Sequence, residues 1–224
     1  DKETLIQIEG GLDFSRKFIP LEIPVPELSR EFILVNADDI HIEDVPRYPE
    51  DLAGVIQISG DGKGYRVVMG FDNNTAEPVN NLPMHLSLHE LRKKQGHERS
   101  VVLDAHPVNL VTLTYLVELD DDKFTELMWR SSSQCVRLFP KGFGVVAEST
   151  DDMSEVSRLV LKHQKDRDVV VLAFHGLVAT GDDMMEVMGM TETIEKAAQI
   201  RMRLLSFPGG IRQEPLLPSE LRTY

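Results

Sequence analysis

An unbroken apolar run late in the chain is the sequence feature that most restricts the fold. The run "DVVVLAFHG", Asp168 to Gly176, has no polar residue between Val169 and Phe174. A strand that is apolar on both faces has to be covered on both sides, so the run predicts a buried strand. Such a strand belongs in a sheet that helices cover on both faces, which indicates a layered α/β fold.

The second half of the chain alternates between helix and strand signals. A helix is predicted for residues 82–95, with Asn80 or Asn81 as the N-cap and Pro83 in the first turn. Further helices are expected at 107–119, 122–131, 152–165 and 182 to about 205, and strands at "SVVLDA", "CVRLF" and "GVVAE". This alternation predicts a mixed sheet between helix layers.

The first third is rich in strands and loops. "GVIQISGDGKGYRVVMGF" places two β runs around Gly60 to Gly64, which is the chemistry of a hairpin turn. "TLIQI" reads as a strand, and "EFILVNADDIHIEDV" reads as strand, turn and strand. The prolines of "FIPLEIPVPEL" favour an extended loop over a helix.

Composition excludes several classes of function. The 224 residues suggest one large domain or at most two small ones, and the net charge of −13 repels nucleic acids and acidic membranes. No apolar run approaches the length of about 18 residues that a membrane span needs. Cys135 is the single cysteine, so an internal disulfide or a cysteine zinc site is impossible. Its strand-like surroundings predict a buried thiol, and this cysteine usage fits the cytoplasm.

Two of the seven histidines terminate strongly apolar runs. His106 ends "VVLDAH" and His175 ends "VVVLAFH", and strand ends in layered α/β folds face the crevice where ligands bind. Asp104 lies two residues before His106, so both side chains leave the same face of a strand. Gly176 predicts a sharp turn beside His175. A metal site and a hydrogen-bonded structural role both remain open. For His85 and His89, at helical spacing, the alternatives are a metal site and a place on an inner helix face near the sheet.

Four segments carry a resemblance, in the same order along the chain. "LPMHLSLH", "LDAHPVNLVTLTYL", "LFPKGFGVV" and "VVVLAFHGLVATGDDMMEVMGMTETIEKAAQI" resemble the class II aldolase/adducin family, from about residue 4 to residue 210. The resemblance implies an α/β fold with a central, mostly antiparallel sheet between helix layers. It also implies one domain over residues 1–224, with the N-terminal part of the family domain missing, and a homotetramer with active sites between subunits.

The resemblance also implies a chemistry. Enzymes of this family hold Zn²⁺ on three histidines and cleave a ketose 1-phosphate into dihydroxyacetone phosphate and an aldehyde, here expected to be L-lactaldehyde. Zn²⁺ acts as a Lewis acid towards the charge that develops on the substrate. A carboxylate transfers a proton at the reacting carbon, and backbone and side-chain groups bind the phosphate.

This chain departs from the family at the positions that the resemblance assigns to the metal and the acids. The His-x-His pair of metal ligands reads Asp104-Ala105-His106 here, and His175 matches the third ligand. Asn81 stands at the position of the catalytic Glu, and Gln134 at the position of a second acid. Neither amide exchanges protons near neutral pH.

The segment that resembles the phosphate-binding loop is also altered. Ala37, Asp38 and Asp39 occupy that loop, and Asn80 is the remaining substrate-binding candidate. Aspartates there repel a phosphate group. Two hypotheses stay open: a zinc enzyme of impaired activity, with Zn²⁺ on Asp104, His106 and His175, or a non-catalytic adducin-like assembly module or inactivated or redesigned scaffold that has lost Zn²⁺. Epimerisation or decarboxylation of a sugar phosphate is a third possibility.

Overall fold

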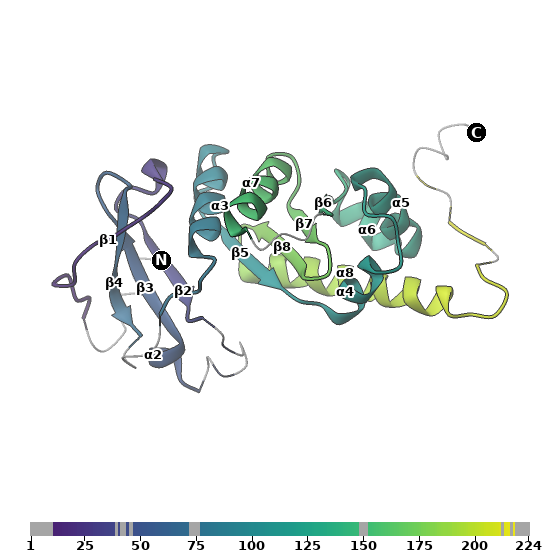
Figure 1. Cartoon of the computed structure of the whole chain (residues 1–224), viewed down its shortest axis with the longest axis horizontal. Helices are drawn as coiled ribbons and strands as arrows, with labels where there is room; N and C mark the ends of the chain where they lie inside the picture. The colour runs from purple at the N-terminus through teal and green to yellow at the C-terminus, as the bar shows by residue number, and fades with distance from the viewer. Residues whose placement is uncertain are drawn as a thin grey trace. The chain divides into compact units, whose positions relative to one another are not determined.

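The computed structural model describes residues 11–38, 40, 44, 47–71, 77–147, 152–211, 213–215 and 217. The mixed α/β class is confirmed (Figure 1). Contacts divide the chain into two compact units, Asp1–Lys94 and Gln95–Tyr224. The described strands form two four-stranded sheets instead of one, while the single family domain stays a prediction. The expected strand "TLIQI" lies outside the described residues.

The first unit contains an antiparallel sheet of order β1-β4-β3-β2. The predicted hairpin is confirmed, and its turn includes Gly62, whose φ of 70° is readily available to glycine. Within "EFILVNADDIHIEDV", a strand ends at Asn36, and much of the remainder lies outside the described residues. The elements are β1 (Ile19–Pro20), η1 (Pro26–Leu28), β2 (Phe32–Asn36), α2 (Pro49–Leu52), β3 (Ala53–Ile58), β4 (Gly64–Gly70) and α3 (Leu82–Lys94).

Helix α3 follows the sequence prediction closely. Leu82 and Leu86 contribute to one apolar core with Ile56, Ile58 and Val35 of the sheet. Because Leu82 and Leu86 are one helical turn apart, they lie on the same face of α3. The apolar spacing of this segment therefore fixes which face of the helix packs within the first unit.

The second unit contains a sheet of order β5-β8-β7-β6. β6 and β7 are parallel, whereas β7–β8 and β5–β8 are antiparallel. The strands are β5 (Val101–Ala105), β6 (Gly144–Val146), β7 (Val169–Leu172) and β8 (Gly176–Gly181), and the helices are α4 (Val108–Thr114), α5 (Asp121–Ser131), α6 (Ser133–Leu138), α7 (Met153–Gln164) and α8 (Met184–Leu205).

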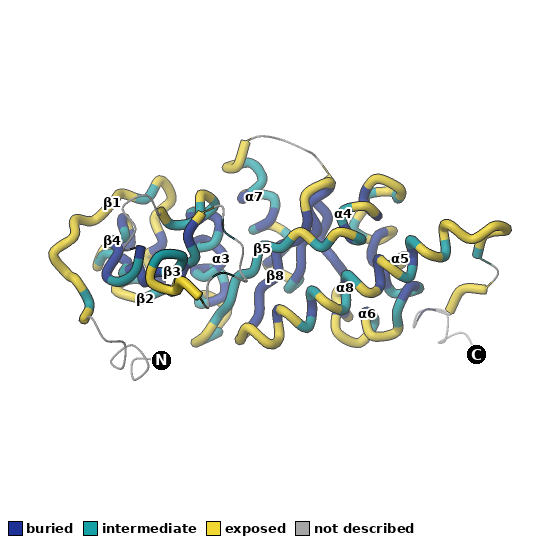
Figure 2. The backbone as a smooth tube through the Cα atoms, turned by 90° about the horizontal axis from the view of Figure 1, so that it is seen from below, coloured by how far each residue is buried: buried dark blue, intermediate teal, exposed yellow. Residues whose placement is uncertain are grey.

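Helices cover both faces of this second sheet. Val171 and Ala179 belong to the core that α4, α5 and α8 share. Val170 and Val178 alternate with them along β7 and β8 and are also fully buried. Helix α7 packs on β6 and β7, and Figure 1 shows it on the opposite side of the sheet from α8. In Figure 2, β8 is coloured as buried along its length, whereas β5 is intermediate.

Three local predictions differ from the structure. "CVRLF" lies mostly in helix α6, which is capped by Ser132, whose side chain accepts a hydrogen bond from the Gln134 N–H. Cys135 is buried as expected, but on a helix and not on a strand. The helix expected at 107–119 ends at Thr114.

The third difference lies in the apolar run that begins at Asp168. It is interrupted by a turn at Ala173–His175, and "GLVATG" forms β8, a strand that the sequence analysis missed. Beyond α8, the described residues form no regular element, as expected. Within the described chain, no helix combines the length and apolar character needed to cross a bilayer.

Candidate functional site

Strand β5 carries the first part of a cluster of polar side chains. Asp104 lies near the end of β5, opposite Val178 of β8, and His106 follows the strand directly. Because Asp104 and His106 are two residues apart on extended backbone, both side chains leave the same face. The antiparallel pairing of β5 with β8 brings this end of β5 beside the turn that carries His175.

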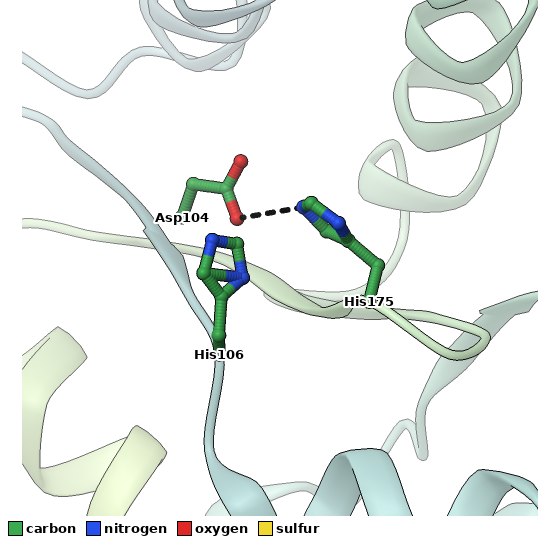
Figure 3. Close-up of side chains that lie close together, drawn as sticks. All are labelled: Asp104, His106 and His175. Carbon is green, nitrogen blue, oxygen red and sulfur yellow. Dashed lines mark ion pairs between the residues drawn. The ribbon is translucent and has the colours of Figure 1, made fainter. Parts of the chain in front are cut away.

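Asp104, His106 and His175 converge at this strand end (Figure 3). One ligand atom from each residue can be chosen so that all three lie within 4.8 Å of one another. The two imidazole rings are 4.4 Å apart between centroids and 78° apart in plane. His175 Nε2 lies 3.9 Å from Asp104 Oδ1. The Asp104 side chain is 16% exposed and that of His175 is 55% exposed, so a solute can reach the cluster.

The tight connection between β7 and β8 places His175. The His175 N–H donates to the Leu172 carbonyl at 3.2 Å, which closes a turn. Phe174 occupies the left-handed region with φ 64°, the conformation that a turn of this kind usually gives to glycine. The ring of Phe174 contacts that of Tyr115 in a tilted arrangement, with centroids 4.6 Å apart and planes at 53°.

Gly176 is needed here for a different reason from the one expected. Its φ is not positive, but a Cβ at this position would lie 2.1 Å from the Ala105 carbonyl oxygen and 3.1 Å from the His106 Cα. Glycine therefore permits β8 to approach β5 closely, and this approach brings the two histidines together.

The donor set suits a divalent transition-metal ion. Two imidazoles and one carboxylate are ligands that Zn²⁺ accepts, and a tetrahedral Zn²⁺ site needs donor atoms about 3.4 Å apart. The three ligand atoms lie within 4.8 Å of one another, and His175 Nε2 is 3.9 Å from Asp104 Oδ1, so binding would require these side chains to move closer together. Within the described residues, this is the one group of three or more histidine, cysteine or acidic side chains with such geometry.

His85 and His89 belong to a different environment, on α3 of the first unit. Burial lowers the pKa of each imidazole to about 4, and for His89 the neighbouring His85 and Arg92 add to the effect. Both rings are therefore neutral near pH 7. They form no acid-containing ligand group in the described chain, so the structural reading is the better supported one.

The remaining substrate-binding candidates are close together in the first unit. The Asn80 N–H donates to Asp38 Oδ1 at 3.2 Å, just before α3 begins. Ala37 is buried and pairs with Pro78 in an isolated β-bridge. Asp38 is exposed, and Asp39 lies outside the described residues.

The two amides at the expected acid positions lie in separate units. Asn81 directly precedes α3, and its carbonyl accepts from the Met84 and His85 N–H groups. Gln134 is exposed in the first turn of α6, where its N–H donates to the Ser132 hydroxyl. The roles of Asn81 and Gln134, like those of the three clustered residues, stay predictions.

Sequence analysis missed two contacts that hold α4 beside the cluster. Glu195 of α8 accepts hydrogen bonds from the Asn109 and Leu110 N–H groups at 3.1 Å each. Thr114 Oγ1 accepts from the Phe174 N–H at 3.0 Å. Glu195 could have been noticed because it lies in "ETIEKAAQ", part of a segment that carries the family resemblance. No sequence feature pointed to Thr114.

Comparison with known proteins shows the family of this chain. The family profile described as Class II Aldolase and Adducin N-terminal domain matches residues 23–202. The chain is similar to a rhamnulose-1-phosphate aldolase of Listeria welshimeri, with 31% identity over 194 residues, 87% of this chain and 69% of the relative. A rhamnulose-1-phosphate aldolase of Escherichia coli O127:H6 is 29% identical over 215 residues, 95% of this chain and 77% of the relative.

A solved structure shows the same fold. The sugar-phosphate aldolase from Thermotoga maritima superposes with a TM-score of 0.71 at 24% identity, covering 89% of this chain and 87% of that one. At this identity the likeness concerns the fold alone.

Proposed function

Because this chain belongs to the class II aldolase and adducin family, we propose that it is an aldolase-type protein that binds a divalent cation, expected to be Zn²⁺, on Asp104, His106 and His175. The observation that carries the proposal is the convergence of two imidazoles and a carboxylate at the β5–β8 strand end. A bound cation would supply Lewis-acid stabilisation of the negative charge that develops when a carbon–carbon bond next to a carbonyl breaks.

The proposed substrate is a ketose 1-phosphate. Relatives of about 30% identity bear the name rhamnulose-1-phosphate aldolase, which supports L-rhamnulose 1-phosphate as the first compound to test. The reaction would give dihydroxyacetone phosphate and L-lactaldehyde, as part of rhamnose metabolism. We further propose that the chain acts in the cytoplasm as a homotetramer, in line with the family resemblance.

Proton transfer is the step at which this chain is expected to be weak. An amide such as that of Asn81 or Gln134 neither gives up nor takes a proton near neutral pH. Loss of a positioned general acid or base ordinarily reduces a rate by about 10²- to 10⁴-fold. Glu90 is a poor replacement, because its carboxylate already accepts from the Glu27 N–H and pairs with Lys94. We therefore propose cation binding with slow cleavage.

A second candidate is a non-catalytic assembly module of the adducin type. It is favoured by the amides at positions 81 and 134, since a module needs no acid or base. It differs from the first candidate in one measurable respect, because a module that has abandoned the chemistry has no need of the cation.

The test combines metal content with turnover. The purified chain is stripped with a chelator and reloaded with Zn²⁺, its metal content is measured, and release of dihydroxyacetone phosphate from L-rhamnulose 1-phosphate is followed with a coupled assay. We expect about one Zn²⁺ per chain and slow release that ceases after stripping. Failure to bind Zn²⁺ would overturn the proposed cation-binding aldolase and favour the non-catalytic assembly module. Rapid release of dihydroxyacetone phosphate would overturn the proposal that cleavage is slow.

A further inference from the structure

Helix α4 is connected at each end to one of the two histidine-bearing segments. It begins at Val108, two residues after His106, and its last residue, Thr114, contacts the backbone of Phe174, the residue before His175. A short helix with both ends fixed in this way sets the distance between the two histidines. The contacts at its ends are therefore candidates for control of the site.

The first of these contacts replaces a missing cap. Pro107 is the N-cap of α4 and provides no side-chain hydrogen bond to the helix N-terminus. The Glu195 carboxylate takes over this role, with Oε1 accepting from the Asn109 N–H and, at 2.6 Å, from Asn109 Nδ2, while Oε2 accepts from the Leu110 N–H. A carboxylate at a helix N-terminus is favoured both by these hydrogen bonds and by the helix dipole. Glu195 therefore fixes the segment that leaves His106.

The second contact stabilises a strained turn. A non-glycine residue in the left-handed region is strained, because its Cβ crowds the following carbonyl oxygen, and Phe174 adopts that conformation. The buried Thr114 hydroxyl accepts from the Phe174 N–H and donates to the Val111 carbonyl at 2.6 Å. The hydroxyl satisfies a backbone group that the turn would otherwise leave without a partner, and it thereby helps to hold His175 in its orientation.

We propose that Glu195 and Thr114 are positioning residues that set the separation of His106 and His175 through helix α4. This inference rests on the proposed cation site, but it also makes a statement about the metal-free protein. Loss of either contact should let the two rings move apart, and the cation affinity should fall. Substitution of groups that orient metal ligands without contacting the metal typically lowers metal affinity by about 10- to 100-fold.

The matched variants are isosteric. Thr114→Val removes the hydroxyl and keeps the shape, and Thr114→Ser keeps the hydroxyl. Thr112→Val is the control, because Thr112 lies on the same helix and its hydroxyl donates to Val108 within α4. Glu195→Gln is paired with Glu192→Gln, since Glu192 is exposed on the same helix α8. Circular dichroism and thermal unfolding establish that each variant is folded.

Two measurements decide the inference. Zn²⁺ affinity, from competition with a chromogenic chelator, should fall about 10-fold or more in Thr114→Val and Glu195→Gln, and remain unchanged in Thr114→Ser and both controls. The visible spectrum of the Co²⁺-loaded protein should change in the same two variants. In crystal structures of the metal-free variants, the ring separation of 4.4 Å should be kept by the controls and lost in Thr114→Val and Glu195→Gln.

Unchanged affinity and ring geometry in folded Thr114→Val and Glu195→Gln would overturn the positioning role. If the unsubstituted chain binds neither cation, the proposed function fails instead. The crystal structures then still decide whether α4 holds the two histidines together.

Discussion

The backbone of Gly176 approaches the Ala105 carbonyl so closely that a Cβ at position 176 would lie 2.1 Å from that oxygen. A contact this short cannot be relieved by a side-chain rotation, because both partners are backbone. The approach also determines how near the two histidine-bearing segments come to each other. Position 176 thus couples the packing of the sheet to the geometry of the site.

Substitution Gly176→Ala is expected to reduce the free energy of unfolding by about 2–4 kcal/mol, because β5 and β8 must separate. Zn²⁺ affinity should fall in the same variant. Gly189→Ala is the control, since a Cβ there meets nothing within 4 Å and alanine is favoured inside a helix by about 0.5–1 kcal/mol. Urea unfolding of both variants provides the comparison, and equal stabilities would contradict the close-approach argument.

Changes at Asp104 should rank the cation affinity in a defined order. Asp104→Ala removes one ligand and is expected to weaken Zn²⁺ binding by about 100-fold or more, whereas Asp104→His should bind at least as tightly as the unsubstituted chain. Asp166→Ala, at an exposed position of the same unit, should leave affinity unchanged. Isothermal titration calorimetry measures all three, and failure of Asp104→His to bind Zn²⁺ would mean that the ligand assignment is wrong.

Restoring an acid should restore part of the cleavage. The double substitution Asp104→His with Asn81→Glu returns a carboxylate to the expected proton-transfer position. Its release of dihydroxyacetone phosphate should exceed that of Asp104→His alone by about 10-fold or more. Gln199→Glu in the same background is the matched control, because Gln199 is an exposed amide on helix α8 that has no assigned role in the site. Equal rates in the two double variants would show that position 81 has no special role.

Stability should decrease as the pH falls from about 6.5 to about 4. Burial lowers the pKa of His85 and of His89 to about 4 in the folded chain, while the ordinary value of about 6.5 applies after unfolding. Between these values the unfolded state binds more protons, so each histidine lowers the free energy of unfolding by at most about 1.4 kcal/mol per pH unit. The slope should be reduced in His85→Leu/His89→Leu, as measured by urea unfolding over this pH range. If the free energy of unfolding of this variant depends on pH as steeply as that of the unsubstituted chain, His85 and His89 are not the cause of the acid sensitivity.

The thiol of Cys135 should be unreactive in the folded protein. Burial raises its pKa to about 12, and the side chain is fully buried. Because the thiolate is the reactive form, Ellman's reagent at pH 8 should detect no thiol in the native chain and one thiol per chain in guanidinium chloride. Rapid reaction of the native protein would contradict the packing of α6.

The long elements could be predicted because their signals are local. The helices α5, α7 and α8 each begin after an aspartate whose side chain accepts backbone hydrogen bonds, and the expected starts lie within two residues of the observed ones. Helix α6 could not be read in this way. It has six residues, and its stability comes from the Ser132 cap and from burial of Cys135 and Phe139, which depend on the rest of the fold.

Local sequence signals predicted only part of the candidate site. Strand parity placed Asp104 and His106 on one face without knowledge of any partner. His175 lies beside Asp104 and His106 because β8 pairs with β5. Strand β8 was missed because the turn before it, Ala173–His175, contains no glycine or proline. Phe174 takes the left-handed conformation there, and no local pattern announces this. The position of His175 at the end of an apolar run made it a candidate for a metal site, and the family resemblance then matched it to the third ligand.

The carboxylate of Asp38 already occupies the Asn80 N–H at the start of α3. A dissolved anion that seeks the same N–H competes with a group on the same chain, whose effective concentration is on the order of millimolar or higher. It also meets like-charge repulsion that weakens with added salt. Neutral solutes meet no such repulsion. The surface around Asp38 and Asn80 therefore favours neutral solutes over anions, whatever their shape.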